Sequence, residues 1–309
     1  MTGVAEAAAL LPKDWRAWVS RLQPEGGPSG EEWVAGLPRL LAGVLDDWGL
    51  TPTGAGMTGW TAVVVPVRRD GEAFALKVGW PHADAQHEHL ALRVWDGRGA
   101  VQLVAADPAR GALLLEALDP AHDLEAASGV DTDTACATIG GILARLHVPA
   151  PPQVRRLSDF AAAEGERLLL ARDRLPRRFL DRAAHLAADL VSDPGCNDRL
   201  LHTDLHFGNV LAGRREPWLA IDPSPMAGHP GLELQPVLRN RVGELGTGSA
   251  FRWGVRRRLE VTCEAAGIDV DAARAWTIWL SVVEANWASL DGDTDAVTLH
   301  LSIAKALED

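Results

Sequence analysis

The stretch LLHTDLHFGNVL, residues 200–211, places four polar side chains, His202, Asp204, His206 and Asn209, between two apolar runs. The apolar flanks predict short strands, and the polar residues between them predict a loop that carries chemistry. Two kinds of site fit this spacing. The two histidines lie four residues apart and could bind a metal from one face of a helix, whereas Asp204 and Asn209, five apart, fit a different chemistry.

A zinc site on the histidines is the weaker interpretation. A pair of metal ligands four residues apart needs a helix, and Gly208 and Asn209 are poor helix formers inside this stretch. We therefore expect His202 to support the backbone of the loop, and His206 to line the site or stabilise it. A hydrolase that uses both histidines remains an alternative, which zinc analysis of the purified protein would test.

Composition and charge exclude several classes of protein. The chain has 309 residues and a formal net charge of −12, which makes nucleic acid and anionic membranes poor partners. No apolar run approaches the roughly 20 residues that span a bilayer, and the N-terminus lacks the basic region of a signal peptide. The three scattered cysteines argue against a disulfide framework and fit a reducing cytoplasm. We expect a cytoplasmic protein.

The order of expected elements indicates an α+β fold with two lobes. The first part reads as a hairpin over residues 61–78, a helix over 83–95 and strands over 101–107 and 111–118. Helices follow over 136–147 and 158–191, and again after the run PWLAID to the C-terminus. We therefore predict a small, β-rich N-terminal lobe (1–117) and a larger, mostly helical C-terminal lobe (118–309).

Asp204, Asn209 and Asp222 fit phosphoryl transfer from ATP. The spacing D-x-x-x-x-N matches the catalytic loop of kinases, in which the Asp acts on the attacking hydroxyl and the Asn binds Mg²⁺. The following apolar run, PWLAIDP, delivers Asp222 at its tip. A short hairpin around Arg214 and Arg215 would bring Asp222 close to Asn209. We predict Asp204 as the catalytic residue, and Asn209 and Asp222 as oxygen ligands of Mg²⁺.

Lys77 and Glu88 supply the pair that such a site needs for the phosphates of ATP. In FALKV, Lys77 shares a strand face with small residues, although a lysine on an edge strand often only reaches water. Glu88 lies on the apolar stripe of the next helix, together with Leu92 and Trp95. A carboxylate there is costly unless it is paired, so we predict an ion pair with Lys77, provided that the helix phase is right.

The remaining contacts to ATP are predicted around two loops. TPTGAGMTGWTAV, with Gly54, Gly56 and Gly59, could approach the phosphates through backbone amides or be an ordinary turn. LLLEALDP (113–120) is the expected connector between the lobes. We predict that its backbone from Glu116 to Leu118 binds the adenine.

These motifs resemble the aminoglycoside/hydroxyurea antibiotic-resistance kinases, a family that includes streptomycin 6-phosphotransferases. HTDLHFGNVL with REPWLAIDP carries most of the resemblance, which covers about residues 30–245 and includes the region around Lys77. It implies a protein-kinase-like fold, ATP and Mg²⁺ as cofactors, and transfer of the γ-phosphate to a small-molecule hydroxyl. The chain departs from the pattern after Asp222, where Glu233 stands in place of the usual aspartate and His229 replaces an acid.

The expected acceptor is a cationic, hydroxyl-bearing small molecule such as streptomycin. Residues 259–309 hold ten acidic and only two basic residues, and Glu284 and Asp291 could pair with amino or guanidino groups, although a solvated surface is the more ordinary explanation of this bias. Trp276, Trp279 and Trp287 could stack on a sugar, or form helix core. The alternatives are a metabolic kinase for an endogenous sugar or amino alcohol, and an inactive nucleotide-binding protein.

Overall fold

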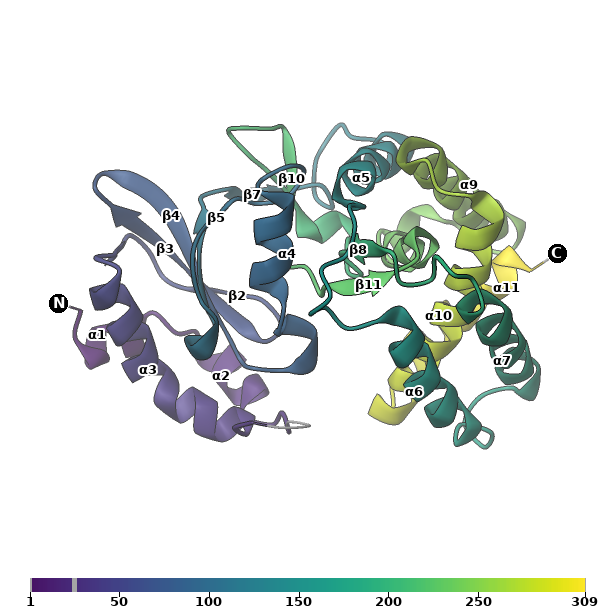
Figure 1. The fold of residues 1–309 in the computed structure, drawn as a ribbon, viewed down its shortest axis with the longest axis horizontal. Helices are drawn as coiled ribbons and strands as arrows, with labels where there is room; N and C mark the ends of the chain where they lie inside the picture. The colour runs from purple at the N-terminus through teal and green to yellow at the C-terminus, as the bar shows by residue number, and fades with distance from the viewer. Residues whose placement is uncertain (1, 24–26, 309) are drawn as a thin grey trace. The chain divides into compact units, whose positions relative to one another are not determined.

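The computed structural model describes residues 2–23 and 27–308, which fall into two compact units, Met1–Asp119 and Pro120–Asp309. The boundary predicted from the sequence follows residue 117. Each unit has its own hydrophobic core, one built around a sheet and the other built from helices. Figure 1 traces the elements of both units along the chain.

The first unit contains a mainly antiparallel sheet and the helices that pack on it. Its strands run in the order β1-β3-β4-β6-β5, and β2 pairs with β3. The elements are α1 (Val4–Ala9), α2 (Lys13–Val19), α3 (Gly30–Asp47), β1 (Thr51–Pro52), β2 (Met57–Thr58), β3 (Ala62–Arg69), β4 (Glu72–Gly79), α4 (Glu88–Trp95), β5 (Leu103–Asp107) and β6 (Ala112–Glu116).

Strand alternation gives the sheet two different faces, and this positions Lys77. On β4, Leu76 and Val78 point into the core that α1, α2 and α3 form with the sheet. Lys77 points to the opposite face, where α4 lies (Figure 1). The predicted hairpin is confirmed, because β3 and β4 pair from Ala62↔Gly79 to Arg69↔Glu72 around a two-residue turn.

The second unit is mostly helical and carries two small sheets, β10-β9-β7 and β11-β8. Its elements are β7 (Asp119–Asp123), α5 (Thr132–Leu146), α6 (Leu157–Leu169), α7 (Arg177–Val191), β8 (Arg199–Leu201), β9 (Val210–Ala212), β10 (Trp218–Ala220), β11 (Met226–Gly228), α8 (Gln235–Leu238), α9 (Ser249–Ala266), α10 (Val270–Asp291) and α11 (Thr294–Leu307). One expectation is wrong: residues 158–191 form two helices, because Pro176 starts α7 after a turn.

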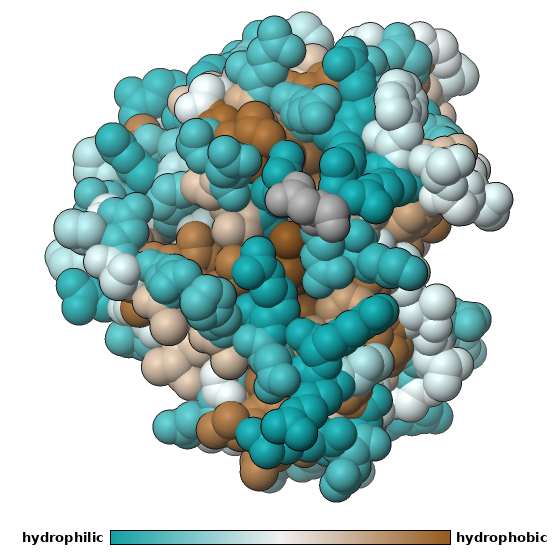
Figure 2. Space-filling model, turned by 90° about the vertical axis from the view of Figure 1, so that its right-hand side faces the viewer, coloured by the Kyte–Doolittle hydropathy of each residue, from teal (hydrophilic) through white to brown (hydrophobic). Residues whose placement is uncertain are grey.

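The core of the second unit lies between α10 and its neighbours α7, α9 and α11, and α5 packs along α9. Trp276 and Trp279 are almost fully buried there, so these two belong to the core and do not stack on a ligand. On the side of this unit shown in Figure 2, hydrophilic residues cover most of the surface and hydrophobic residues appear in smaller areas between them. Within residues 2–23 and 27–308, no helix is long and apolar enough to cross a membrane.

Candidate active site

The polar loop of the opening motif is held between two strand pairs. Before the loop, β8 pairs with β11, with Leu201 opposite Met226. After the loop, β9 forms a hairpin with β10, with Val210 opposite Ala220. A 3-10 turn at Phe207–Asn209 leads into β9, so the loop contains no α-helix that could place two histidines on one face. The predicted hairpin is confirmed, and the loop is anchored at both ends.

Asn209 holds Asp204 through two hydrogen bonds. The Asn209 amide donates from Nδ2 to the Asp204 backbone oxygen at 2.9 Å and to its Oδ2 at 3.2 Å. These two contacts fix Asn209, which is buried, against Asp204, whose side chain is about one-third exposed. Because Nδ2 faces Asp204, the amide oxygen of Asn209 points away from it.

Asp222 lies two residues after the end of β10, and the residue before it is hydrogen-bonded to the backbone of Asn209. The Ile221 amide donates to the Asn209 carbonyl at 2.9 Å, which confirms that the hairpin brings the two segments together. Asp222 has a positive φ of 57°, in the left-handed region that costs a non-glycine residue on the order of 1 kcal/mol. Strain of this kind is typical of residues that are held for a function.

His202 is a structural residue of the loop. It is fully buried, its Nε2 lies 2.9 Å from the Ile221 carbonyl, and its Nδ1 accepts from the Asp204 amide at 3.3 Å. The ring is therefore the neutral tautomer with the proton on Nε2, and burial lowers its pKa. Since backbone groups use both ring nitrogens, His202 supports the loop as expected, and it offers no lone pair to a metal.

Glu233 replaces the usual aspartate and fixes the start of the loop. Its buried carboxylate accepts from the His202 amide at 2.6 Å and from the Thr203 amide at 2.9 Å. Thr203 has a positive φ of 59°, and its hydroxyl donates to the Ser224 carbonyl. The glutamate thus serves the ordering role that the motif requires, and it holds a strained residue immediately before Asp204.

Replacing Glu233 should therefore loosen the loop that carries Asp204, the predicted catalytic residue. In Glu233→Gln an amide group faces one of the two backbone N–H donors, and we expect a loss of about 2 kcal/mol of stability and a fall in kcat of about tenfold or more. Thermal melting and steady-state kinetics measure both effects, with Glu260→Gln on the exposed side of α9 as the matched control. Wild-type kcat in Glu233→Gln would show that the loop does not depend on this carboxylate.

His206 and Gly208 shape the middle of the loop. The Gly208 amide donates to His206 Nδ1 at 3.1 Å, and His206 Nε2 lies 4.0 Å from Asp204 Oδ2. Burial is the largest influence on His206 and lowers its pKa. A Cβ atom on Gly208 would come within 2.9 Å of the Glu125 carboxylate and 3.0 Å of the His206 ring, so a larger residue there would have to displace these side chains. His206 therefore stabilises the loop and also lies near Asp204.

In the first unit, the predicted pair of Lys77 and Glu88 is confirmed. Lys77 Nζ lies 2.7 Å from both carboxylate oxygens of Glu88, and both residues are buried. Glu88 is the first residue of α4, where the N-terminal end of the helix dipole favours a negative charge. Buried charges persist only when they are paired, so the two side chains hold each other in place on this face of the sheet.

The glycine-rich stretch is used mainly for packing. The Gly56 amide donates to the Leu10 carbonyl at 2.9 Å, and the Gly59 amide donates to Ala62. A Cβ atom on Gly56 would lie 2.6 Å from that Leu10 carbonyl, which explains the glycine. These amides therefore do not point at a phosphate, and the turn interpretation fits both glycines better.

Glu116 ends β6, and Leu118 lies between β6 and β7, at the end of the first unit. The Glu116 amide donates to the Gln102 carbonyl at 3.0 Å, and its side chain accepts from the Gln102 amide at 2.7 Å. The Glu116 N–H is thus committed within the sheet. A contact of this residue with adenine would have to use its carbonyl, alongside the backbone of Leu118.

Arg239 is a residue of the site that sequence reasoning missed. Its Nη2 lies 2.5 Å from Asp204 Oδ1, in an ion pair between side chains that are 34% and 35% exposed. Arg239 follows α8, thirty-five residues after Asp204 in the sequence. The only sequence signal was an arginine at the end of the buried run LELQPVL, which does not indicate a partner.

Acidic residues of the C-terminal helices differ in their surroundings. Glu284 on α10 is mostly buried, with 23% of its side chain exposed, and burial raises the pKa of its carboxyl group. Its Oε2 lies 3.9 Å from Nε2 of His300 on α11. Asp291, at the end of α10, is exposed. Of these two carboxylates, Glu284 is therefore the one placed inside the fold.

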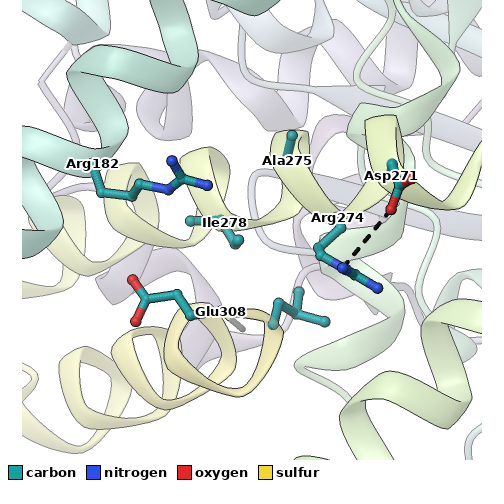
Figure 3. A pocket seen from close by; sticks show the side chains of 7 residues that line it. Arg182, Asp271, Arg274, Ala275, Ile278 and Glu308 are labelled. Carbon is teal, nitrogen blue, oxygen red and sulfur yellow. Dashed lines mark ion pairs between the residues drawn. The ribbon is translucent and has the colours of Figure 1, made fainter.

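A separate pocket of about 420 Å³ lies between α7, α10 and the end of α11 (Figure 3). Arg182 reaches into it from α7, and Arg274 pairs with Asp271 at 3.8 Å on α10. None of its lining residues belongs to the predicted site.

Comparison with known proteins decides the family. The sequence model of the aminoglycoside/hydroxyurea antibiotic resistance kinases matches residues 47–292. The chain belongs to this family of kinases. The match begins later than the region of resemblance read from the motifs, and it continues through α9 and α10, so these two helices are part of the family's pattern as well.

Relatives of this chain are named for the phosphorylation of small molecules. A hydroxyurea phosphotransferase from Kitasatospora aureofaciens is 43% identical, over 91% of this chain and 82% of that protein. A streptomycin 6-kinase from Streptomyces glaucescens is 41% identical, over 91% and 92%. The kinase and phosphotransferase class expected from the sequence is thereby confirmed.

Solved structures confirm the α+β, protein-kinase-like fold of this resistance kinase. The aminoglycoside phosphotransferase APH(4)-Ia, in a complex with ADP and hygromycin B, aligns with a TM-score of 0.57 at 14% identity, over 86% of this chain and 96% of that one. The choline kinase LicA from Streptococcus pneumoniae aligns with a TM-score of 0.58 at 14% identity, over 90% and 99%. At such low identity the likeness concerns the fold alone.

Proposed function

We propose that this protein transfers the γ-phosphoryl group of ATP to a hydroxyl group of a cationic small molecule, with streptomycin as the first candidate. The observation that carries the proposal is the anchored loop that holds Asp204 against Asn209, with Asp222 beside it. In this proposal Asp204 accepts or orients the proton of the attacking hydroxyl. Lys77, held by Glu88, binds the phosphates, and the backbone at Glu116 and Leu118 binds the adenine.

Mg²⁺ fits the donors that the loop provides. The Asn209 amide oxygen is directed away from Asp204, and the Asp222 carboxylate follows the strand beside it, so both offer the oxygen ligands that this ion prefers. These two residues would hold the ion. When bound, it would neutralise charge on the phosphates of ATP.

Asp222 should therefore set the requirement for Mg²⁺. For Asp222→Asn we expect the Mg²⁺ concentration that gives half-maximal activity to rise by about tenfold or more, because one anionic ligand is lost. Titration of Mg²⁺ at saturating ATP measures this, with Asp189→Asn on the exposed side of α7 as the control. An unchanged Mg²⁺ curve would remove Asp222 from the metal site.

Two observations support the proposed acceptor: the carboxylate of Glu284 and the names of the relatives. Glu284 offers a negative charge from within the fold for an amino or guanidino group, and two relatives with about the same coverage are named streptomycin 6-kinases. Hydroxyurea is the second candidate, because the relative at 43% identity is a hydroxyurea phosphotransferase. An endogenous sugar or amino alcohol would be the third.

A coupled assay of ADP release tests these candidates directly. The panel contains streptomycin, hygromycin B, hydroxyurea, choline and simple sugars, and mass spectrometry identifies each product. We expect streptomycin to gain one phosphoryl group, with a kcat/KM far above that for choline or the sugars. Tight ATP binding without turnover on any acceptor would instead favour an inactive nucleotide-binding protein.

A further inference from the structure

Arg239 holds a positive charge directly on the carboxylate proposed to receive the acceptor's proton. Its Nη2 lies 2.5 Å from Asp204 Oδ1, and the residues of α8 that precede it, Gln235–Leu238, are all buried. The Arg239 amide donates to the Gln235 carbonyl at 3.2 Å. The backbone that carries the guanidinium is thus anchored in the core, so this charge is a fixed part of the site.

The charge of Arg239 also influences a second carboxylate. Its charge acts on Glu284, where it favours the ionised form and opposes the rise in pKa that burial causes. Its Nε is buried, and no described residue accepts a hydrogen bond from it. Arg239 is therefore paired directly with Asp204 and also acts electrostatically on Glu284.

A cationic acceptor creates a problem for a catalytic carboxylate. An ammonium or guanidinium group binds a carboxylate more strongly than a neutral hydroxyl does, so an open Asp204 would attract the wrong group. Arg239 already occupies Oδ1 and repels a second cation. A carboxylate has about four lone-pair sites, so contacts from Arg239 and Asn209 still leave room for a hydroxyl. Discrimination by repulsion of this kind is a common source of specificity.

We propose that Arg239 is a positioning and specificity-determining residue, which denies Asp204 to the acceptor's cationic group so that only a hydroxyl reaches it. The proposal rests on the proposed function.

The test compares Arg239→Gln and Arg239→Lys with wild type, using streptomycin as the acceptor and putrescine, a diamine without a hydroxyl group, as the inhibitor. In Arg239→Gln we expect kcat to fall about tenfold without a rise in the KM of streptomycin, because the acceptor binds in the wrong orientation. Putrescine should inhibit this variant about tenfold more strongly, since Asp204 is open to it. Arg239→Lys keeps the charge and should stay close to wild type in both measurements.

Arg257→Gln is the matched control, because it breaks an ion pair of 2.8 Å with Asp133 on the surface of the same unit. It should change neither kcat nor putrescine inhibition. The proposal is overturned if Arg239→Gln leaves kcat unchanged, if kcat falls with no change in putrescine inhibition, or if the lysine variant fails equally. If the wild type phosphorylates no acceptor, the proposed function fails. Calorimetry of putrescine binding still tests Arg239 in that case, because Arg239→Gln should bind putrescine more tightly than the wild type, and equal affinities would contradict the proposal.

Discussion

Asp204→Asn should lower kcat by about 10²- to 10⁴-fold and leave the affinity for ATP nearly unchanged. The asparagine keeps the size of the side chain and can still contact Asn209, which lies 3.2 Å from Asp204 Oδ2. It cannot accept the hydroxyl proton, and it cannot pair with Arg239 as an ion. Steady-state kinetics with streptomycin and calorimetry with ATP measure the two effects separately.

The control for this change is Asp198→Asn, an exposed aspartate just before the same loop. It should retain wild-type kcat, because its carboxylate lies outside the anchored stretch. If Asp204→Asn turned over streptomycin at the wild-type rate, Asp204 would have no part in the chemistry. A large rise in the KM of ATP with unchanged kcat would instead assign this residue to nucleotide binding.

Lys77→Met should damage both stability and the use of ATP. It leaves the Glu88 carboxylate buried without the ammonium group that lies 2.7 Å away, and breaking a buried pair in this way costs about 3–5 kcal/mol. The phosphates of ATP would also lose the positive charge of Lys77 that is proposed to bind them, which should raise the KM of ATP and lower kcat. Chemical denaturation and ATP kinetics measure the two consequences.

The double variant Lys77→Met with Glu88→Leu separates these effects. Replacing both charges with apolar groups of similar size should restore much of the stability, while activity should stay low. Lys305→Met, an exposed lysine on α11, serves as the control for the loss of one charge. If the single variant Lys77→Met kept the wild-type KM of ATP and the wild-type kcat, Lys77 would not hold the phosphates.

Local patterns in the sequence were sufficient for much of the site. Alternation along β4 separated Lys77 from Leu76 and Val78, and helical spacing placed Glu88 on the buried side of α4, so their pairing could be predicted. The hairpin of β9 and β10 followed from apolar runs on either side of two arginines. In each case the partners lie close together in the sequence or share one regular element.

Contacts set by the tertiary fold could not be predicted in this way. The position of Arg239 depends on how α8 packs, and nothing near it in the sequence indicates Asp204. Gly56 looked like a residue of a phosphate loop, yet its amide is bound by the Leu10 carbonyl, from a segment far away in the sequence. One helical stretch was expected over residues 158–191, and the turn before Pro176 that separates α6 from α7 was not predicted.

The most direct test of the whole account is mass spectrometry of streptomycin after incubation with ATP, Mg²⁺ and either the wild-type protein or Asp204→Asn. The account predicts that wild type adds one phosphoryl group to a hydroxyl of streptomycin, and that the variant forms almost none of this product in the same time. Equal yields of phosphorylated streptomycin from both proteins would contradict it, as would release of inorganic phosphate as the sole product of the wild type with every acceptor.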